Sequence, residues 1–165
     1  MFYRSTVSIL ILLQLCGCKS QHWSHENIKS DTQLNTILSI DFQTGFKNDT
    51  LALWIGESNV LSETVASTVP EASFTSIRIS LYKGLGNLIP NFIHQLKNGE
   101  NTVKNSSITI REIIEIKIHI RPEEGQSITE KISLDLSKGK YIGILKSSSM
   151  HTIAIRQSET AFSYY

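Results

Sequence analysis

Two histidines and a glutamate form the densest group of possible metal ligands. They lie within the segment 22–26, HWSHE, as His22, His25 and Glu26. Imidazole nitrogens and carboxylate oxygens are ligands for zinc and copper. The surrounding segment is polar and has no regular period, so no scaffold is expected to hold these side chains in a coordination geometry. We therefore predict no metal and no other cofactor, and keep His22 and His25 as the candidate ligands.

A second group has the residue types of nucleophilic catalysis. The serines 147–149 precede His151. A serine activated by histidine also needs a carboxylate that orients the base, for which Asp135 is a candidate, and His119 is an alternative base. The chain lacks a GxSxG motif, and a serine-rich turn between strands explains the segment. We predict that the protein is not an enzyme.

Calcium and sugars are two further possible ligands. Asp41, Asn48 and Asp49 carry the oxygen atoms that calcium prefers, although Asn48-Asp49 is also a typical turn former, which we favour. Trp54 lies on the face opposite to Leu53 and Ile55 in an alternating segment. An indole on a solvated sheet face stacks on sugars. We predict Trp54 as a possible ligand platform, with core packing as the alternative.

The elements that must position these residues are strands. Apolar and polar residues alternate with a period of two, and turn residues separate the runs. The runs cover 38–42, 51–55, 60–61, 77–82, 108–120, 128–136, 141–145 and 152–156. They predict an all-β domain, an antiparallel β-sandwich of about seven to eight strands, immunoglobulin-like or C2-like in general shape. A barrel is the alternative.

One stretch does not follow this alternation. Between Gly84 and Asn105, the apolar residues Leu88, Ile89, Phe92, Ile93 and Leu96 are spaced more like a helical face. Pro90 is compatible with the first turn of a short helix. We expect this stretch to be a crossover that covers the core, and the alternative is an apolar lip of a binding surface.

Composition and charge exclude two classes of protein. The chain has 165 residues, 40% of them hydrophobic, so one globular domain is expected rather than disorder. Its 16 basic residues nearly balance 15 acidic ones, and no basic stripe is evident. Because nucleic-acid binding depends on a basic surface, we predict no nucleic-acid partner.

The amino terminus has the features of a secretory signal. Arg4 precedes a short apolar run from Val7 to Leu15. That run is too short for a stable membrane span, which needs about 20 apolar residues. Both cysteines of the chain follow it, as Cys16 and Cys18. No disulfide framework is therefore expected in the remainder.

The segment Leu15-Cys16-Gly17-Cys18 resembles the lipobox of bacterial lipoproteins. The resemblance covers about twenty residues. It implies a signal peptide over residues 1–17, cleavage before Cys18, a diacylglyceryl thioether on that cysteine and acylation of its new amino group, for example with palmitate. Cys16 stands where the lipobox usually has Ala, Ser or Thr, but its side chain is similarly small. Several acyl chains anchor a protein durably, since each buried CH₂ contributes about 0.8 kcal/mol.

These expectations divide the chain and suggest a role. Residues 18–33 form a lipidated cysteine and a flexible tether, and 34–165 form a single sandwich domain. In the lipoproteins that this segment resembles, an Asp after the lipidated cysteine often signals retention in the inner membrane, so Lys19 implies the outer membrane if the host has one. We predict a lipid-anchored lipoprotein of the cell envelope that acts as a non-enzymatic binding or structural module. Its partners would be the membrane, through the anchor, and an envelope protein or glycan.

Two alternatives belong to other classes. One is an envelope enzyme or enzyme accessory with a site assembled from loops around His151 or Asp135. The other is a secreted eukaryotic glycoprotein, for which Asn48-Asp49-Thr50 and Asn105-Ser106-Ser107 are acceptor motifs.

Overall fold

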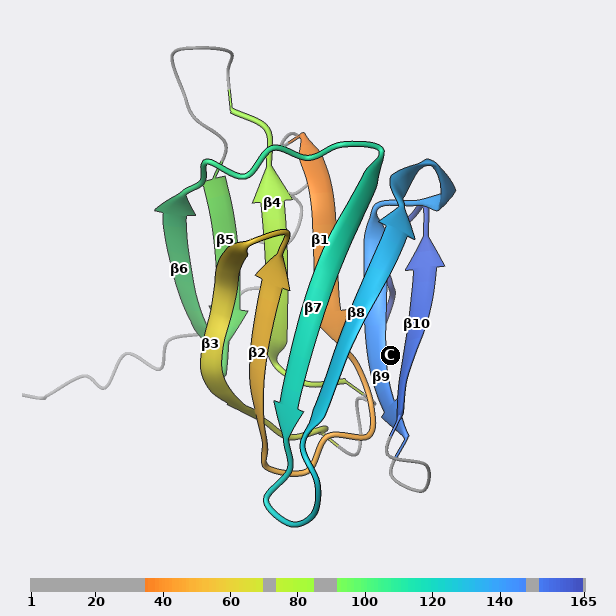
Figure 1. Cartoon of the computed structure of the whole chain (residues 1–165). Coiled ribbons are helices and arrows are strands. Elements are labelled where there is room, and N and C mark those ends of the chain that lie inside the picture. The colour runs from red at the N-terminus through yellow and green to blue at the C-terminus, as the bar shows by residue number, and fades with distance from the viewer. Residues whose placement is uncertain (1–34, 70–73, 85–91, 148–151, 165) are drawn as a thin grey trace, which may run out of the picture. The chain divides into compact units, whose positions relative to one another are not determined.

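The computed structural model describes residues 35–69, 74–84, 92–147 and 152–164, all within one compact unit, Thr32–Tyr165 (Figure 1). These residues form ten strands and one short 3-10 helix, η2 (Leu136–Lys138). The strands are β1 (Thr36–Phe42), β2 (Asp49–Ile55), β3 (Ser58–Ala66), β4 (Ile77–Tyr82), β5 (Phe92–Lys97), β6 (Glu100–Asn105), β7 (Ile113–Arg121), β8 (Ile128–Asp135), β9 (Tyr141–Ser147) and β10 (Thr152–Ser158). In this part of the chain, no helix is long and apolar enough to cross a membrane.

Two sheets pack face to face, as the two layers of ribbons in Figure 1 show. The six-stranded sheet has the order β10-β9-β1-β4-β5-β6, and the four-stranded sheet has the order β3-β2-β7-β8. This confirms the all-β sandwich. Two details differ from expectation: the described residues form ten strands rather than seven or eight, and β1 pairs with β9 in parallel although the other strand pairs are antiparallel.

Alternation places the apolar residues between the sheets. On β7, Ile116, Ile118 and Ile120 are fully buried, whereas the intervening side chains face outward. Register carries the pattern across the sheet, since Leu53 of β2 pairs with Ile118 and Leu51 pairs with Ile120. The six-stranded sheet supplies the opposite half of the core with Leu38, Ile40, Phe42, Ile79, Ile142 and Ile144. β-branched side chains suit these positions because they pack well on a pleated surface.

The stretch from Gly84 to Asn105 was expected to resemble a helix, and this prediction is wrong for its described part. Residues 92–105 form the hairpin β5–β6, whereas Leu88, Ile89 and Pro90 lie outside the described residues. The turn is Asn98-Gly99, and both residues have positive φ, 48° and 86°. Such a turn matches the twist of the two strands it joins. The alternation of apolar and polar residues is not evident in β5 because a polar residue, Gln95, occupies a core-facing position in the middle of the strand. Its side chain donates a hydrogen bond to the Val60 carbonyl of β3.

A buried ion pair links the two sheets near one end of the sandwich. Lys146 of β9 faces inward, and its Nζ lies 2.7 Å from Oδ1 of Asp49 on β2. The exposed fractions of the two side chains are only 9% and 1%. The second carboxylate oxygen of Asp49 accepts a hydrogen bond from the backbone N–H of Lys47 at 2.9 Å. Both oxygens of this buried carboxylate are therefore satisfied, as burial of a charge requires.

The residues after β10 pack onto the outer face of the six-stranded sheet. The ring centroids of Tyr164 and Phe74 are 4.6 Å apart. The Tyr164 hydroxyl accepts a hydrogen bond from Gln43 Nε2 at 3.0 Å. Beside it, Arg78 donates to Asp41 at 2.5 Å. Burial raises the pKa of Asp41, although the Arg78 guanidinium opposes this. Burial, followed by the Asp41 charge, raises the pKa of Tyr164 to about 12.

Candidate functional site

Trp54 stands on the outer face of the four-stranded sheet. Its neighbours on β2, Leu53 and Ile55, are buried in the core, so the indole projects to the opposite side and is half-buried. In register it pairs with Asn59 on β3 and Lys117 on β7. The alternation of β2 thus places this side chain on the face expected from the sequence.

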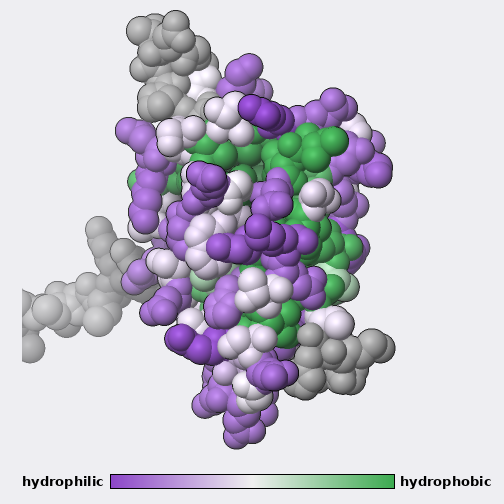
Figure 2. All heavy atoms as spheres, viewed as in Figure 1, coloured by the Kyte–Doolittle hydropathy of each residue, from purple (hydrophilic) through white to green (hydrophobic). Residues whose placement is uncertain are grey.

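A shallow hollow of about 200 Å³ surrounds the indole. Strand β2 contributes Thr50 and Ala52 to it, and β7 contributes His119 and Arg121. Figure 2, in the same view as Figure 1, shows that this face is largely hydrophilic, with hydrophobic surface at the end where β7 begins and along the right side of the view. We call these residues and Trp54, together with Asn59, Ser62, Glu63 and Lys117, the Trp54 face.

Charged side chains are arranged around the ring. Lys117 Nζ lies 3.9 Å from the Trp54 ring centroid, within the range of a cation–π contact. Arg121 Nη1 lies 3.9 Å from Oε1 of Glu63 on β3, and the two side chains form an exposed ion pair. His119 Nδ1 and the Thr129 hydroxyl are 2.7 Å apart. Lys117 thus lies over one face of the indole, while Arg121, Glu63 and His119 place charged and hydrogen-bonding groups around the ring.

These groups can contact a ligand by packing and by hydrogen bonding. An indole packs against the C–H face of a sugar or against an apolar side chain, and the rim groups then fix orientation by hydrogen bonds. From the sequence we identified Trp54 but missed its neighbours Lys117 and Arg121. Their signal was present, since both alternate with buried isoleucines on the outward face of β7.

The candidate catalytic residues that are described do not meet. Asp135 pairs with Ile113 at one end of the β7–β8 ladder, whereas His119 pairs with Thr129 six residues further along β7. At 3.3 Å per residue this separation is about 20 Å. Asp135 instead caps η2, accepting hydrogen bonds from the Ser137 hydroxyl at 2.6 Å and the Ser137 N–H at 3.0 Å. These hydrogen bonds lower the pKa of Asp135. His151, Ser148 and Ser149 lie outside the described residues.

The candidate calcium ligands are engaged separately. Asp41 pairs with Arg78, and Asp49 pairs with Lys146. Asn48 has positive φ, as expected of a turn residue, and its side chain bonds to Ser67 and Glu123. No cluster of three or more His, Cys, Asp or Glu side chains suited to a metal occurs among the described residues. Cys18, His22 and His25 lie outside them.

Comparison of the chain with known protein families, with curated proteins and with solved structures found no match.

Proposed function

We propose that this protein is a lipid-anchored lipoprotein of a bacterial cell envelope whose β-sandwich acts as a non-enzymatic binding module. The Leu15–Cys18 segment supports the anchor because its final cysteine offers the sulfur that takes the diacylglyceryl group. Cys16 and Cys18 are the only two cysteines in the sequence, so no thiol of the sandwich domain competes with Cys18 as the lipidation site. Anchoring by several acyl chains holds a small domain at a membrane surface durably.

The single observation that supports the binding role is the position of Trp54. A half-buried indole on the solvent side of a mainly polar sheet costs hydrophobic free energy that a core position would recover. Aromatic residues and Arg are enriched in recognition surfaces. We propose that the Trp54 face contacts an envelope protein or a glycan.

The anchor is tested by labelling with radioactive palmitate in a bacterial host. We expect the full-length chain to incorporate label and to partition into detergent, and we expect Cys18→Ala to lose both properties. Cys16→Ala is the matched control, because it removes the other thiol while keeping a small residue before Gly17. Equal labelling of wild type and Cys18→Ala, or no labelling of either, would refute the anchor.

The binding face is tested by capture from envelope extracts. We expect Trp54→Ala to lose a component that the wild type retains. Ile113→Ala is the control because Ile113 is 65% exposed on β7 of the same sheet but does not line the Trp54 hollow. Equal loss in both variants would indicate unspecific apolar adhesion and would contradict the proposal.

A further inference from the structure

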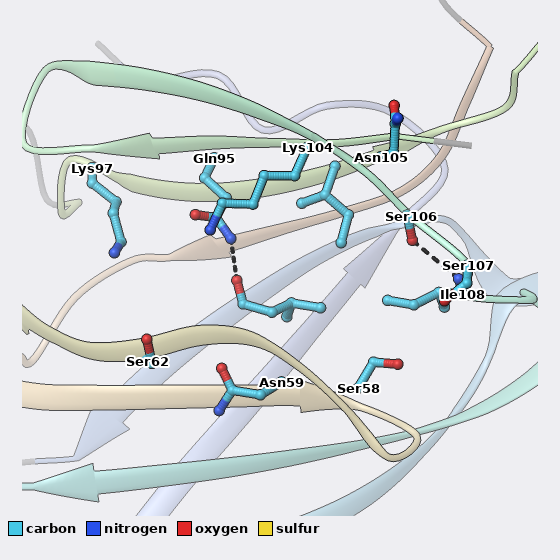
Figure 3. A pocket seen from close by; sticks show the side chains of 12 residues that line it. Ser58, Asn59, Ser62, Gln95, Lys97, Lys104, Asn105, Ser106, Ser107 and Ile108 are labelled. Carbon is cyan, nitrogen blue, oxygen red and sulfur yellow. Dashed lines mark hydrogen bonds between the residues drawn. The ribbon is translucent and has the colours of Figure 1, made fainter. Parts of the chain in front are cut away.

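A second hollow opens at the edge of the sandwich, between β3 of the four-stranded sheet and the β5–β6 hairpin of the other sheet. Its volume is about 210 Å³. Strand β6 is the edge strand of its sheet, and all six of its residues are exposed. We call this hollow the edge cleft (Figure 3).

The edge cleft is cationic. Lys97 and Lys104 line it, and none of the lining residues within the described part of the chain is an aspartate or a glutamate. Register explains their direction: Lys97 pairs with Ile77 and Lys104 pairs with Ile93, and both isoleucines face the core side of the sheet. Figure 3 shows the two lysine side chains extending from the hairpin into the space above β3. Glu100, which pairs with Lys97, is exposed and is not part of the lining.

The other walls combine an apolar floor with a polar rim. Val60, Ile93 and Ile108 supply the floor, with exposed fractions between 4% and 8%. Asn59 and Ser62 lie on the opposite wall in Figure 3, and Ser106 accepts a hydrogen bond from the Ile108 N–H at 3.1 Å, which orders the third side. A pyranose ring has the complementary character, since its C–H face is apolar and its hydroxyl edge is polar.

We propose that the edge cleft binds an acidic saccharide unit, with Lys97 and Lys104 pairing with its carboxylate or sulfate. This proposal deepens the proposed binding function because it names a ligand class. The cleft and the Trp54 hollow share Asn59 and Ser62, so β3 forms the common wall of both. One oligosaccharide crossing β3 would place an acid between the two lysines and a neighbouring ring beside Trp54.

An acidic peptide fits these walls less well. An extended peptide commonly binds by adding a strand to a free sheet edge, using backbone hydrogen bonds. The Val60 carbonyl of β3 already accepts a hydrogen bond from Gln95, whose side chain is only 5% exposed. One of the two lone pairs of that carbonyl oxygen is therefore already used by a side chain of the domain.

The test is titration calorimetry on the full-length protein in detergent. The probes are acidic oligosaccharides bearing uronate, sialate or sulfate, each beside its neutral counterpart. We expect at least one acidic probe to bind, its neutral counterpart to bind about tenfold more weakly, and added salt to weaken binding. Failure of every acidic probe would overturn the proposal. Binding of a poly-glutamate peptide through the same lysines, in place of any saccharide, would overturn it in favour of a peptide site.

Variants assign the site. The double variant Lys97→Gln/Lys104→Gln is expected to weaken binding about tenfold. Lys83→Gln is the matched control, because Lys83 is exposed and lies outside the cleft lining. Urea midpoints confirm that each variant is folded.

If Trp54→Ala abolishes binding while the lysine variant does not, the edge cleft proposal fails but the binding role of the Trp54 face stands. Palmitate labelling is independent of all these outcomes.

Discussion

Tyr164 connects the end of the chain with a charged pair on the six-stranded sheet. It contacts Phe74 and Gln43 and lies close enough to the Asp41–Arg78 pair for the Asp41 charge to affect its pKa. Burial and this negative charge both oppose ionisation of the phenol. The tail is therefore fixed by a group whose neutral form is favoured in the folded state.

This contact predicts a loss of stability in alkali. The pKa of Tyr164 is 10.0 when unfolded and about 12 when folded, so its contribution is complete below pH 10 and is lost as the pH rises toward 12. At pH 11 the full effect would be about 1.4 kcal/mol, and solvent screening of a partly exposed ring roughly halves it. Urea unfolding at pH 8 and pH 11 should show a smaller decrease for Tyr164→Phe than for wild type. Parallel decreases would refute this assignment.

At the scale of elements, the Lys146–Asp49 pair ties β9 to β2 across the core. Removing one partner leaves a buried charge without a counterion, which costs about 3–5 kcal/mol. We therefore expect Lys146→Met to lower the free energy of unfolding by that amount. Adding Asp49→Asn should restore at least half of the loss, because it removes the orphaned charge. Urea unfolding of the single and double variants measures this coupling, and simple additivity of the two losses would contradict it.

The β5–β6 hairpin depends on its two-residue turn. Gly99 has φ 86°, and a Cβ added there would meet no atom within 4 Å, so an alanine adds only backbone strain. We expect Gly99→Ala to lower the free energy of unfolding by about 1 kcal/mol. Thr102→Ala, an exposed change on β6, serves as the control. An unchanged urea midpoint for Gly99→Ala would show that the turn conformation is not constrained.

The elements also show how far sequence patterns reach. Strands with alternating isoleucine or leucine, such as β7 and β9, could be predicted because one face of each is buried. The hairpin β5–β6 could not be recognised by apolar alternation, because Gln95 occupies its buried centre and β6 is exposed throughout. Its available signal was the Asn98-Gly99 turn. Trp54 could be placed by alternation, whereas the edge cleft depends on which strands become neighbours, which local patterns do not encode.

At the scale of the whole molecule, the last two strands complete the core. Ile142 and Ile144 of β9 are fully buried, and β9 supplies one of the two partners of β1. A chain ending at Lys140 would lack these contacts and expose one edge of β1. We expect such a chain to show no cooperative urea transition by circular dichroism. A sigmoidal transition with the wild-type slope would indicate that the remaining strands fold alone.

The parallel pairing of β1 with β9 also has a consequence for timing. Ile40 of β1 pairs with Ile142 of β9, so this pairing cannot form until about a hundred further residues have been synthesised. During synthesis, β1 can pair with β4 long before β9 is made, so its other edge stays unpaired until the last strands are complete and can pair with other chains in the meantime. We therefore expect aggregation of incomplete chains to compete with folding until the final hairpin, β9–β10, has been made.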